Sequence, residues 1–269
     1  MVGGSDQRVG LLLCQGPAAR HLLVVVPPSR EGMTRITWLG HAGFLIESKG
    51  SRIVIDAWRD GPTWPGTKLE DIDFVLVTHG HFDHASSAPS ICDETGASLV
   101  SNFEIGMWAQ QNGVPAEKIV GMNKGGTYEE KGWTFTLVPA EHSSGCPGEG
   151  NAIVPGGEAC GFVIETPDGD VLYHAGDTCA FLDMQLIAEL YRPTLAMLPI
   201  GDHFTMGPKG AAKAVELLGV EHVVPMHYGT FPALRGTPDE LRERVGPSIA
   251  IHAPEPGGTL DLDPLLLEA

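Results

Sequence analysis

The sequence has little positive charge. Lysine and arginine together number 17, against 34 aspartate and glutamate residues, so the formal net charge is −17 over 269 residues. Proteins that bind nucleic acid usually present a basic surface to the phosphate backbone, and this sequence contains no run of lysine and arginine that could form one. We therefore expect no nucleic-acid partner.

Long apolar segments are also missing. The longest apolar run covers residues 22–26, whereas a membrane-spanning helix requires roughly 18 to 20 such residues. The start of the chain has only Arg8 ahead of a short leucine stretch, which is not typical of a secretory signal. We expect no membrane partner and a cytoplasmic location.

Cysteine is scarce and scattered. The five residues form no Cys-x-x-Cys pair: Cys14, Cys92, Cys146, Cys160 and Cys179. An odd number without paired spacing is typical neither of a disulfide framework nor of a cysteine-rich zinc module. We expect free thiols.

The first 32 residues differ from the rest, because glycine, proline and arginine interrupt two short apolar patches there. We interpret 1–32 as an N-terminal extension and 33–269 as one domain. One hypothesis is that the natural chain starts at Met33, so that the extension comes from an upstream start assignment. The alternative is an additional edge strand at 21–26.

From Met33 onwards, strand-like and helix-like segments alternate. Strands are predicted at 34–38, 43–47, 52–56, 73–78, 98–100, 134–138, 161–165 and 171–174. Helices are predicted at 103–112, 183–191 and 208–218, and a capping box at 237–240 opens one that runs to Val245. Two β-rich halves that each carry helices can bury their sheets by packing them face to face. We therefore predict an α+β fold, a four-layer αββα sandwich, although no internal repeat is legible.

The motif with the clearest chemistry is THGHFDH at 78–84, directly after the apolar segment 74–77. Residues two apart in an extended stretch point the same way, so His79 and His81 can face one cation while Asp83 and His84 face a neighbouring position. Imidazole suits zinc, and a mixed nitrogen and carboxylate set also admits manganese or iron. The alternative is that these are ordinary polar residues of a surface loop.

This motif and six further stretches resemble the metallo-β-lactamase superfamily. The resemblance is to its branch of small metal-dependent hydrolases, which is UPF0173-like and related to the ascorbate-6-phosphate lactonases, and it covers nearly all of the chain from Met33. The further stretches are WLGHAGFLIE at 38–47, MNKGG at 122–126, EHSSG at 141–145, HAGDT at 174–178, GDHFTMGP at 201–208 and PMHYG at 225–229.

The resemblance implies a centre of two divalent ions, with zinc as the first expectation and manganese as the alternative. It implies that one ion is held by His79, His81 and His142, and the second by Asp83, His84 and His227. Asp177 would bridge the two ions, since a carboxylate has an oxygen for each.

Three further residues are candidates for supporting roles. In the superfamily an aspartate at the position of Asp56 orients a metal ligand from outside the coordination sphere; the alternative is a turn cap. His41 and His203 are candidates for lining the pocket and contacting substrate, and ordinary hydrogen bonding is the alternative for both.

The implied reaction is hydrolysis by a hydroxide that bridges two metals, with Asp83 or Asp177 accepting a proton. A small-molecule ester, lactone or phosphodiester is the expected substrate, and the resemblance favours a lactone or a phosphorylated metabolite. A nuclease is disfavoured, because the 49 residues between Asp177 and His227 leave no room for a large inserted domain. The alternative from another class is a catalytically inactive metal-binding sensor or scaffold. A homo-oligomer is compatible with the sequence.

Overall fold

The computed structural model describes residues 32–150 and 152–262. The predicted extension, except for Gly32, and the alternative strand at 21–26 lie outside this part of the chain. Within it, two seven-stranded sheets carry the fold, and a two-stranded hairpin stands beside them.

The first sheet comes from the first half of the chain and from the last strand. Its order is β16-β1-β2-β3-β4-β5-β6. The strands from β16 to β3 pair antiparallel, and those from β3 to β6 pair parallel. The bounds are β1 Thr34–Trp38, β2 Phe44–Ser48, β3 Ser51–Ile55, β4 Phe74–Leu76, β5 Ser98–Asn102, β6 Ile119–Met122 and β16 Thr259–Leu262.

The second sheet repeats this change of direction. Its order is β15-β14-β13-β12-β11-β8-β7. The strands from β7 to β12 pair antiparallel, and those from β12 to β15 pair parallel. The bounds are β7 Thr127–Glu130, β8 Trp133–Pro139, β11 Cys160–Glu165, β12 Val171–His174, β13 Leu195–Pro199, β14 His222–Met226 and β15 Ala250–Ile251. The two-half symmetry that no sequence repeat revealed is therefore visible in strand direction.

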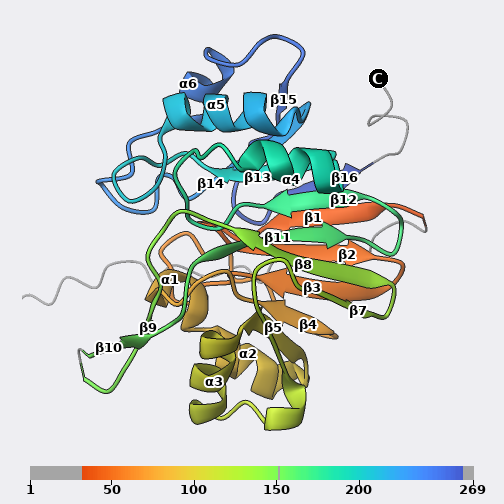
Figure 1. Cartoon of the computed structure of the whole chain (residues 1–269), viewed down its shortest axis with the longest axis vertical. Helices are drawn as coiled ribbons and strands as arrows, with labels where there is room; N and C mark the ends of the chain where they lie inside the picture. Colours follow the sequence, from red (N-terminus) through yellow and green to blue (C-terminus); the bar gives the residue numbers. More distant parts are fainter. Residues whose placement is uncertain (1–31, 151, 263–269) are drawn as a thin grey trace, which may run out of the picture.

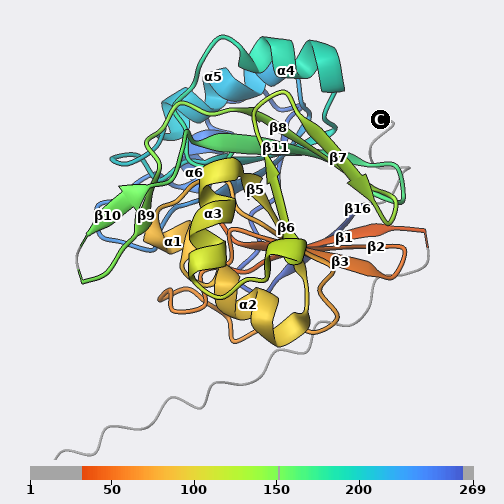
Figure 2. The ribbon, with the colours of Figure 1, turned by 60° about the horizontal axis from the view of Figure 1, so that its bottom comes forward.

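Helices cover the outer faces of both sheets. Figures 1 and 2 show α2 and α3 on one side of the molecule and α4, α5 and α6 on the other. The bounds are α1 Phe82–Ala85, α2 Ala88–Thr95, α3 Phe103–Gln111, the 3-10 helix Ala116–Lys118, α4 Met184–Tyr191, α5 Pro208–Leu218 and α6 Pro238–Arg242. The hairpin consists of β9 Gly145–Pro147 and β10 Ile153–Pro155.

Three buried clusters account for the layers. The central one joins the facing sides of the two sheets, with Phe44 and Phe74 from the first sheet and Phe135 and Phe162 from the second. Neighbouring strand residues point the opposite way, so Val54 and Val75 pack under α2 and α3 in a second cluster. A third cluster lies between the second sheet and α4 and α5. The predicted four-layer αββα sandwich is confirmed.

Local sequence signals place several elements accurately. Helices α3, α4 and α5 begin and end within one residue of the predicted bounds. The capping box of Thr237 and Glu240 forms, but α6 ends at Arg242 rather than Val245, because the chain continues there as turns whose amides bond the Asp239 and Leu241 carbonyls. Helices α1 and α2 were not predicted, nor were eight of the described strands: β6, β7, β9, β10, β13, β14, β15 and β16. None of the helices in the described part is long and apolar enough to cross a membrane.

Candidate metal centre

Most of the predicted site residues follow strands at one edge of the sandwich. Asp56 follows β3 and His79 follows β4 in the first sheet, while Asp177 follows β12 and His227 follows β14 in the second. The carboxyl ends of neighbouring parallel strands lie at the same sheet edge. Two strands in each sheet therefore deliver side chains to one place from distant parts of the chain.

The first group of ligand atoms consists of His79, His81 and His142, as predicted, and these atoms lie within 4.8 Å of one another. His79 Nε2 lies 3.0 Å from His81 Nδ1. Burial lowers the pKa of each of the three imidazoles. Burial thus favours the neutral imidazole, which is the form that binds a metal ion.

The second group contains the predicted Asp83, His84 and His227, and also His41. The backbone is extended at His81 and turns into helix α1 at Phe82, so Asp83 and His84 are carried on a helical turn rather than on the extended stretch that the motif predicted. This turn places both residues in the second group, and the ring of His84 also lies next to that of His79, with centroids 4.0 Å apart. All four members of the second group are buried.

Asp177 lies between the two groups. Its Oδ2 lies 3.6 Å from His142 Nε2 and 3.8 Å from His79 Nε2. The same oxygen lies 3.1 Å from His227 Nε2, and Oδ1 lies 3.4 Å from His84 Nε2. Burial alone would raise the pKa of this carboxyl group, but His227 and His84 hold it well below its usual value. An ionised carboxylate is therefore placed where a bridging ligand is expected.

Asp56 supports this arrangement from outside it. Its carboxylate accepts hydrogen bonds from the backbone amide and the hydroxyl of Thr78, at 2.9 and 2.6 Å. Its Oδ2 also lies 2.8 Å from His84 Nδ1, which leaves His84 Nε2 turned towards Asp177. Burial would lower the pKa of His84, but the carboxylates of Asp177 and Asp56 raise it well above its usual value. This position therefore favours a positive charge, which a divalent cation would supply.

The donor set fits a metal centre. In the described part of the chain, buried atoms without a hydrogen-bond partner include His84 Nε2, Asp177 Oδ1 and both ring nitrogens of His227. Leaving such atoms unpaired costs about 1–3 kcal/mol each. His84 Nε2 faces Asp177 Oδ1 across 3.4 Å, and His227 Nε2 faces the other oxygen of that carboxylate across 3.1 Å. Nitrogen and carboxylate ligands at these separations suit zinc or manganese.

A cavity of about 690 Å³ opens above the two groups. His81, Asp83, His142, Asp177 and His227 form its base together with Ser143, and its walls are apolar: Phe82, Phe204, Phe231, Pro232 and Ala233. His203 is exposed, and its ring packs edge-on against Phe204 with centroids 4.5 Å apart. The wall at this point is therefore formed by Phe204.

Two features of the site were missed by sequence reasoning. His41 was considered only for substrate contact, although the GHAG turn after β1 brings its imidazole into the second ligand group. The aromatic walls were not predicted, because Phe82, Phe204 and Phe231 come from three separate loops and helices whose approach is set by the tertiary fold. The GHAG stretch itself was a usable signal for His41.

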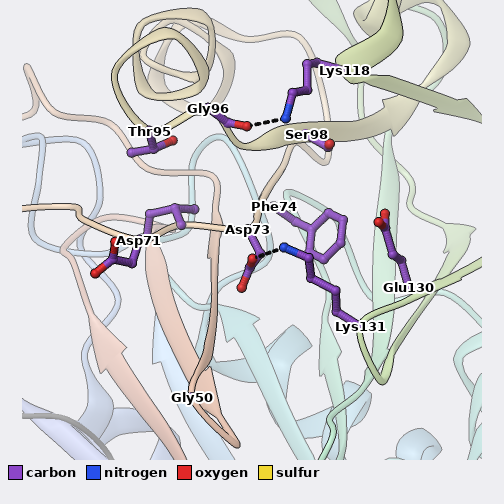
Figure 3. A pocket seen from close by; sticks show the side chains of 11 residues that line it. Gly50, Asp71, Asp73, Phe74, Thr95, Gly96, Ser98, Lys118, Glu130 and Lys131 are labelled. Atoms are coloured by element: carbon purple, nitrogen blue, oxygen red, sulfur yellow. Dashed lines mark hydrogen bonds and ion pairs between the residues drawn. The ribbon is translucent and has the colours of Figure 1, made fainter.

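A second cavity, of about 390 Å³, lies at the opposite edge of the first sheet (Figure 3). It is lined by residues at the amino ends of β4 and β5, and by the turn between β7 and β8. Its lysines are already engaged: Lys131 pairs with Asp73, and Lys118 donates to the Gly96 carbonyl at 2.6 Å. This cavity brings together no group of free metal-ligand atoms comparable to the first.

Comparison with known proteins gives the same fold and chemistry. The model of the Beta-lactamase superfamily domain matches residues 35–227. A UPF0173 metal-dependent hydrolase of Rubrobacter xylanophilus is 48% identical over 236 residues, which cover 85% of this chain and 97% of that protein. Igni18, a metallo hydrolase from Ignicoccus hospitalis, is 37% identical with a TM-score of 0.74, covering 86% of this chain and 99% of that one. The metallo-beta-lactamase fold protein YhfI from Bacillus subtilis shares the fold at 13% identity, with a TM-score of 0.62 and coverage of 85% and 99%.

Proposed function

We propose that this chain, which belongs to the β-lactamase superfamily and within it to the UPF0173 metal-dependent hydrolases, uses two divalent ions to hydrolyse a neutral ester or lactone. The observation that carries the proposal is the cavity: two groups of metal-ligand atoms form its base, and apolar side chains form its walls. Zinc is the proposed metal and manganese the alternative.

The lining favours an uncharged substrate. Among the described residues that line the cavity, none is lysine or arginine, whereas three are phenylalanine. Phosphate groups in protein sites commonly contact arginine, lysine or backbone amides in addition to any metal ion, and the lining of this cavity offers no arginine or lysine. An ester or lactone with an apolar group fits better than the phosphorylated metabolite or phosphodiester that the sequence left open.

When bound, two divalent ions would lower the pKa of a shared water from about 15.7 towards about 7 and polarise the substrate carbonyl. Asp83 and Asp177 line the cavity, and neighbouring imidazoles lower the pKa of both carboxyl groups. Either carboxylate is placed to accept the proton that the attacking water loses. A substrate bound between Phe82, Phe204 and Phe231 would displace water from the cavity, which would strengthen the electrostatic interactions at its base.

The test compares substrates on protein of defined metal content. After removal of metal with a chelator, we expect no turnover, and zinc or manganese should restore hydrolysis of p-nitrophenyl butyrate and of a γ-lactone. Bis-p-nitrophenyl phosphate should be turned over at least tenfold more slowly. Faster cleavage of the phosphodiester would contradict the proposed substrate class. Full ester turnover by metal-free protein would contradict the mechanism, and metal binding without any turnover would favour the sensor or scaffold alternative.

A further inference from the structure

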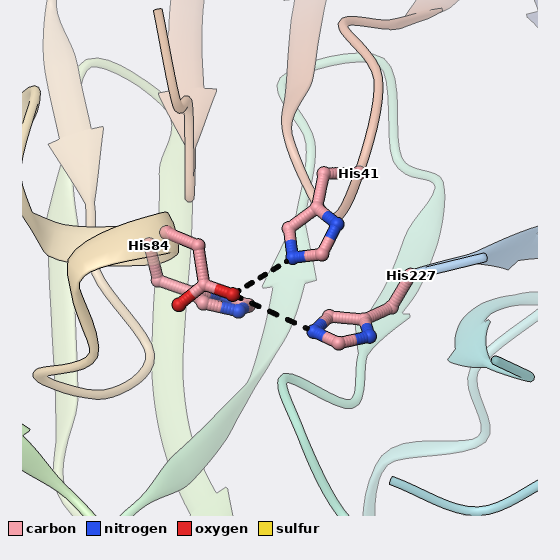
Figure 4. Close-up of side chains that lie close together, drawn as sticks. His41, His84 and His227 are labelled. Carbon is pink, nitrogen blue, oxygen red and sulfur yellow. Dashed lines mark hydrogen bonds and ion pairs between the residues drawn. The ribbon is translucent and has the colours of Figure 1, made fainter. Parts of the chain in front are cut away.

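His41 is buried beside the second ligand group. Its Nε2 lies 3.0 Å from Asp83 Oδ2, and its ring centroid lies 3.9 Å from that of His227 and 5.6 Å from that of His84. Figure 4 shows the imidazoles of His41, His84 and His227 converging from three separate segments. The potential ligand atoms of these three residues and of Asp83 all lie within 4.8 Å of one another.

The far side of the His41 ring determines which nitrogen can bind an ion. Nδ1 lies 2.9 Å from Thr230 Oγ1, and the Thr230 hydroxyl itself donates to the Tyr228 carbonyl oxygen. With the hydroxyl proton directed at that carbonyl, at 3.4 Å, Thr230 Oγ1 accepts from His41 Nδ1–H, and this tautomer leaves the lone pair on Nε2. Metal-binding histidines commonly donate their second ring N–H to an oxygen in this way.

This assignment leaves two lone pairs facing each other. His41 Nε2 and Asp83 Oδ2 approach to 3.0 Å; in this tautomer a cation between or beside them makes the approach favourable, whereas in the other tautomer Nε2–H donates to the carboxylate. His174 shows the contrast, because it is equally buried but both of its nitrogens are used: Nε2 lies 3.0 Å from the Ala42 carbonyl oxygen, and Nδ1 accepts from the Gly176 amide.

The backbone fixes His41 in place. Its φ of 51° lies in the left-handed region, which is unfavourable for a residue with a Cβ atom. Its carbonyl accepts from the His227 amide at 2.8 Å and from Trp38 Nε1 at 3.0 Å. His227 also has a positive φ, of 55°. Unfavourable backbone angles that the surrounding structure maintains cluster at functional sites.

We propose that His41 is a direct ligand of the second ion, together with Asp83, His84 and His227, with Asp177 shared between the ions. This inference rests on the two-metal function proposed above. It makes the two positions unequal: the second has four buried ligands of its own, whereas the first has three, of which His81 and His142 are partly exposed. The second ion is therefore the tightly held one, and the first keeps an open position for substrate.

Zinc binding to the metal-free full chain tests this, measured by equilibrium dialysis with elemental analysis. The wild type should bind two zinc ions with unequal affinity. His41→Asn, a change to a residue that tolerates left-handed backbone, should weaken the tighter site by at least about 10- to 100-fold and leave the weaker one unchanged. His203→Asn is the matched control, since His203 is an exposed histidine with a φ of 62°, and it should leave both affinities unchanged.

The cobalt(II)-substituted protein separates a ligand from a residue that only orients Asp83. Loss of a nitrogen ligand should change the visible absorption of the cobalt in His41→Asn, and added imidazole should restore it in His41→Gly. Wild-type protein that binds fewer than two ions would contradict the proposed function itself. Two ions in the wild type, with unchanged affinities or an unchanged cobalt spectrum in His41→Asn, would overturn the role of His41 alone. Circular dichroism establishes that each variant is folded.

Discussion

The two edges of the first sheet carry cavities that are built in opposite ways. At the carboxyl ends of β3 and β4, polar atoms are buried, face one another and lack hydrogen-bond partners within the described chain. At the amino ends of β4 and β5, the charges of Lys131 and Asp73 are paired with each other, and Lys118 is bonded to a backbone carbonyl. Polar groups that are already satisfied offer little to a ligand. The first cavity therefore has unpaired polar atoms that could bind an ion, whereas the polar groups of the second cavity already bind one another.

The largest effect is expected at Asp177, which lies between both ligand groups. Asp177→Asn keeps the size of the side chain but removes the charge that two cations would share. Ester hydrolysis should fall by more than about 100-fold, beyond the range seen for residues that only support ligands, and the zinc content should drop. Steady-state kinetics and elemental analysis measure both. If the folded variant hydrolysed the ester as fast as the wild type, the first cavity would no longer differ from the second as a catalytic site.

A smaller loss is expected at Asp56, which contacts His84 from behind. Asparagine tolerates the positive φ of 46° at this position, so Asp56→Asn changes the charge rather than the turn. Metal affinity or kcat/KM should fall by roughly 10- to 100-fold. Since Asp56 also accepts two hydrogen bonds from Thr78, a thermal melt should accompany the kinetics. A loss equal to that of Asp177→Asn would mean that Asp56 acts directly on an ion.

The apolar wall should affect substrate binding more than the chemical step. Phe204 lines the cavity and is 53% exposed, so Phe204→Ala should leave the fold intact. KM for an apolar ester should rise by roughly 3- to 30-fold, with kcat little changed, because the lost apolar contact is worth on the order of 1–2 kcal/mol. Leu190→Ala, at an exposed leucine of α4, is the control and should leave KM unchanged. A large fall in kcat would instead place Phe204 near the reacting atoms.

The smallest effect is expected in the opposite cavity. Lys131→Met removes the partner of Asp73 and should leave ester turnover unchanged, while the free energy of unfolding falls by no more than about 1 kcal/mol. Burial would raise the pKa of Asp73, but Lys131, Ser51 and the Arg52 amide hold it below the usual 3.8. A carboxyl group whose pKa is lower in the folded protein than in the unfolded chain stabilises the fold at pH values above its pKa in the unfolded chain. This stabilisation is lost as the pH falls through the pKa of the folded protein.

The difference between wild type and Lys131→Met should therefore be present at neutral pH and disappear at pH values well below about 4. Denaturant titrations at pH 7 and pH 3 measure it. A marked loss of turnover in this variant would show that the opposite cavity contributes to catalysis.

Much of this site could be predicted because its residues stand in short local patterns. The 78–84 motif carries four of the proposed ligands within six residues, and glycine-flanked turns after strands carry His142 and His227. Apolar patterns likewise identified five of the seven strands of the first sheet and three of the seven strands of the second. Six of the seven ligands predicted from the sequence fall into two neighbouring groups, and Asp177 lies between these groups; their roles as ligands stay predictions.

Other features depend on contacts between distant segments. The place of His41 depends on β1 and β14 lying in different sheets that meet at one edge, which no local pattern shows. Helix α2 was missed because Ala88–Thr95 has few apolar residues and contains proline, serine, cysteine, aspartate and threonine, which are weak helix formers. Its stability comes from packing Ile91 and Cys92 beneath the first sheet, and that contact exists only in the folded protein. The cytoplasmic location and the homo-oligomer also stay predictions.

The hydrogen bond from the His227 amide to the His41 carbonyl joins the two halves of the chain. His41, His79, His81, Asp83 and His84 belong to the half that builds the first sheet, whereas His142, Asp177 and His227 belong to the half that builds the second. Ions held by both sets would act as a clasp that fastens one rim of the sandwich, much as a cross-link would. Ligands that bind only the native state stabilise it. Stripping the ions should therefore loosen this rim first, and amide hydrogen exchange in the loops after β1 and β14 would record the loosening.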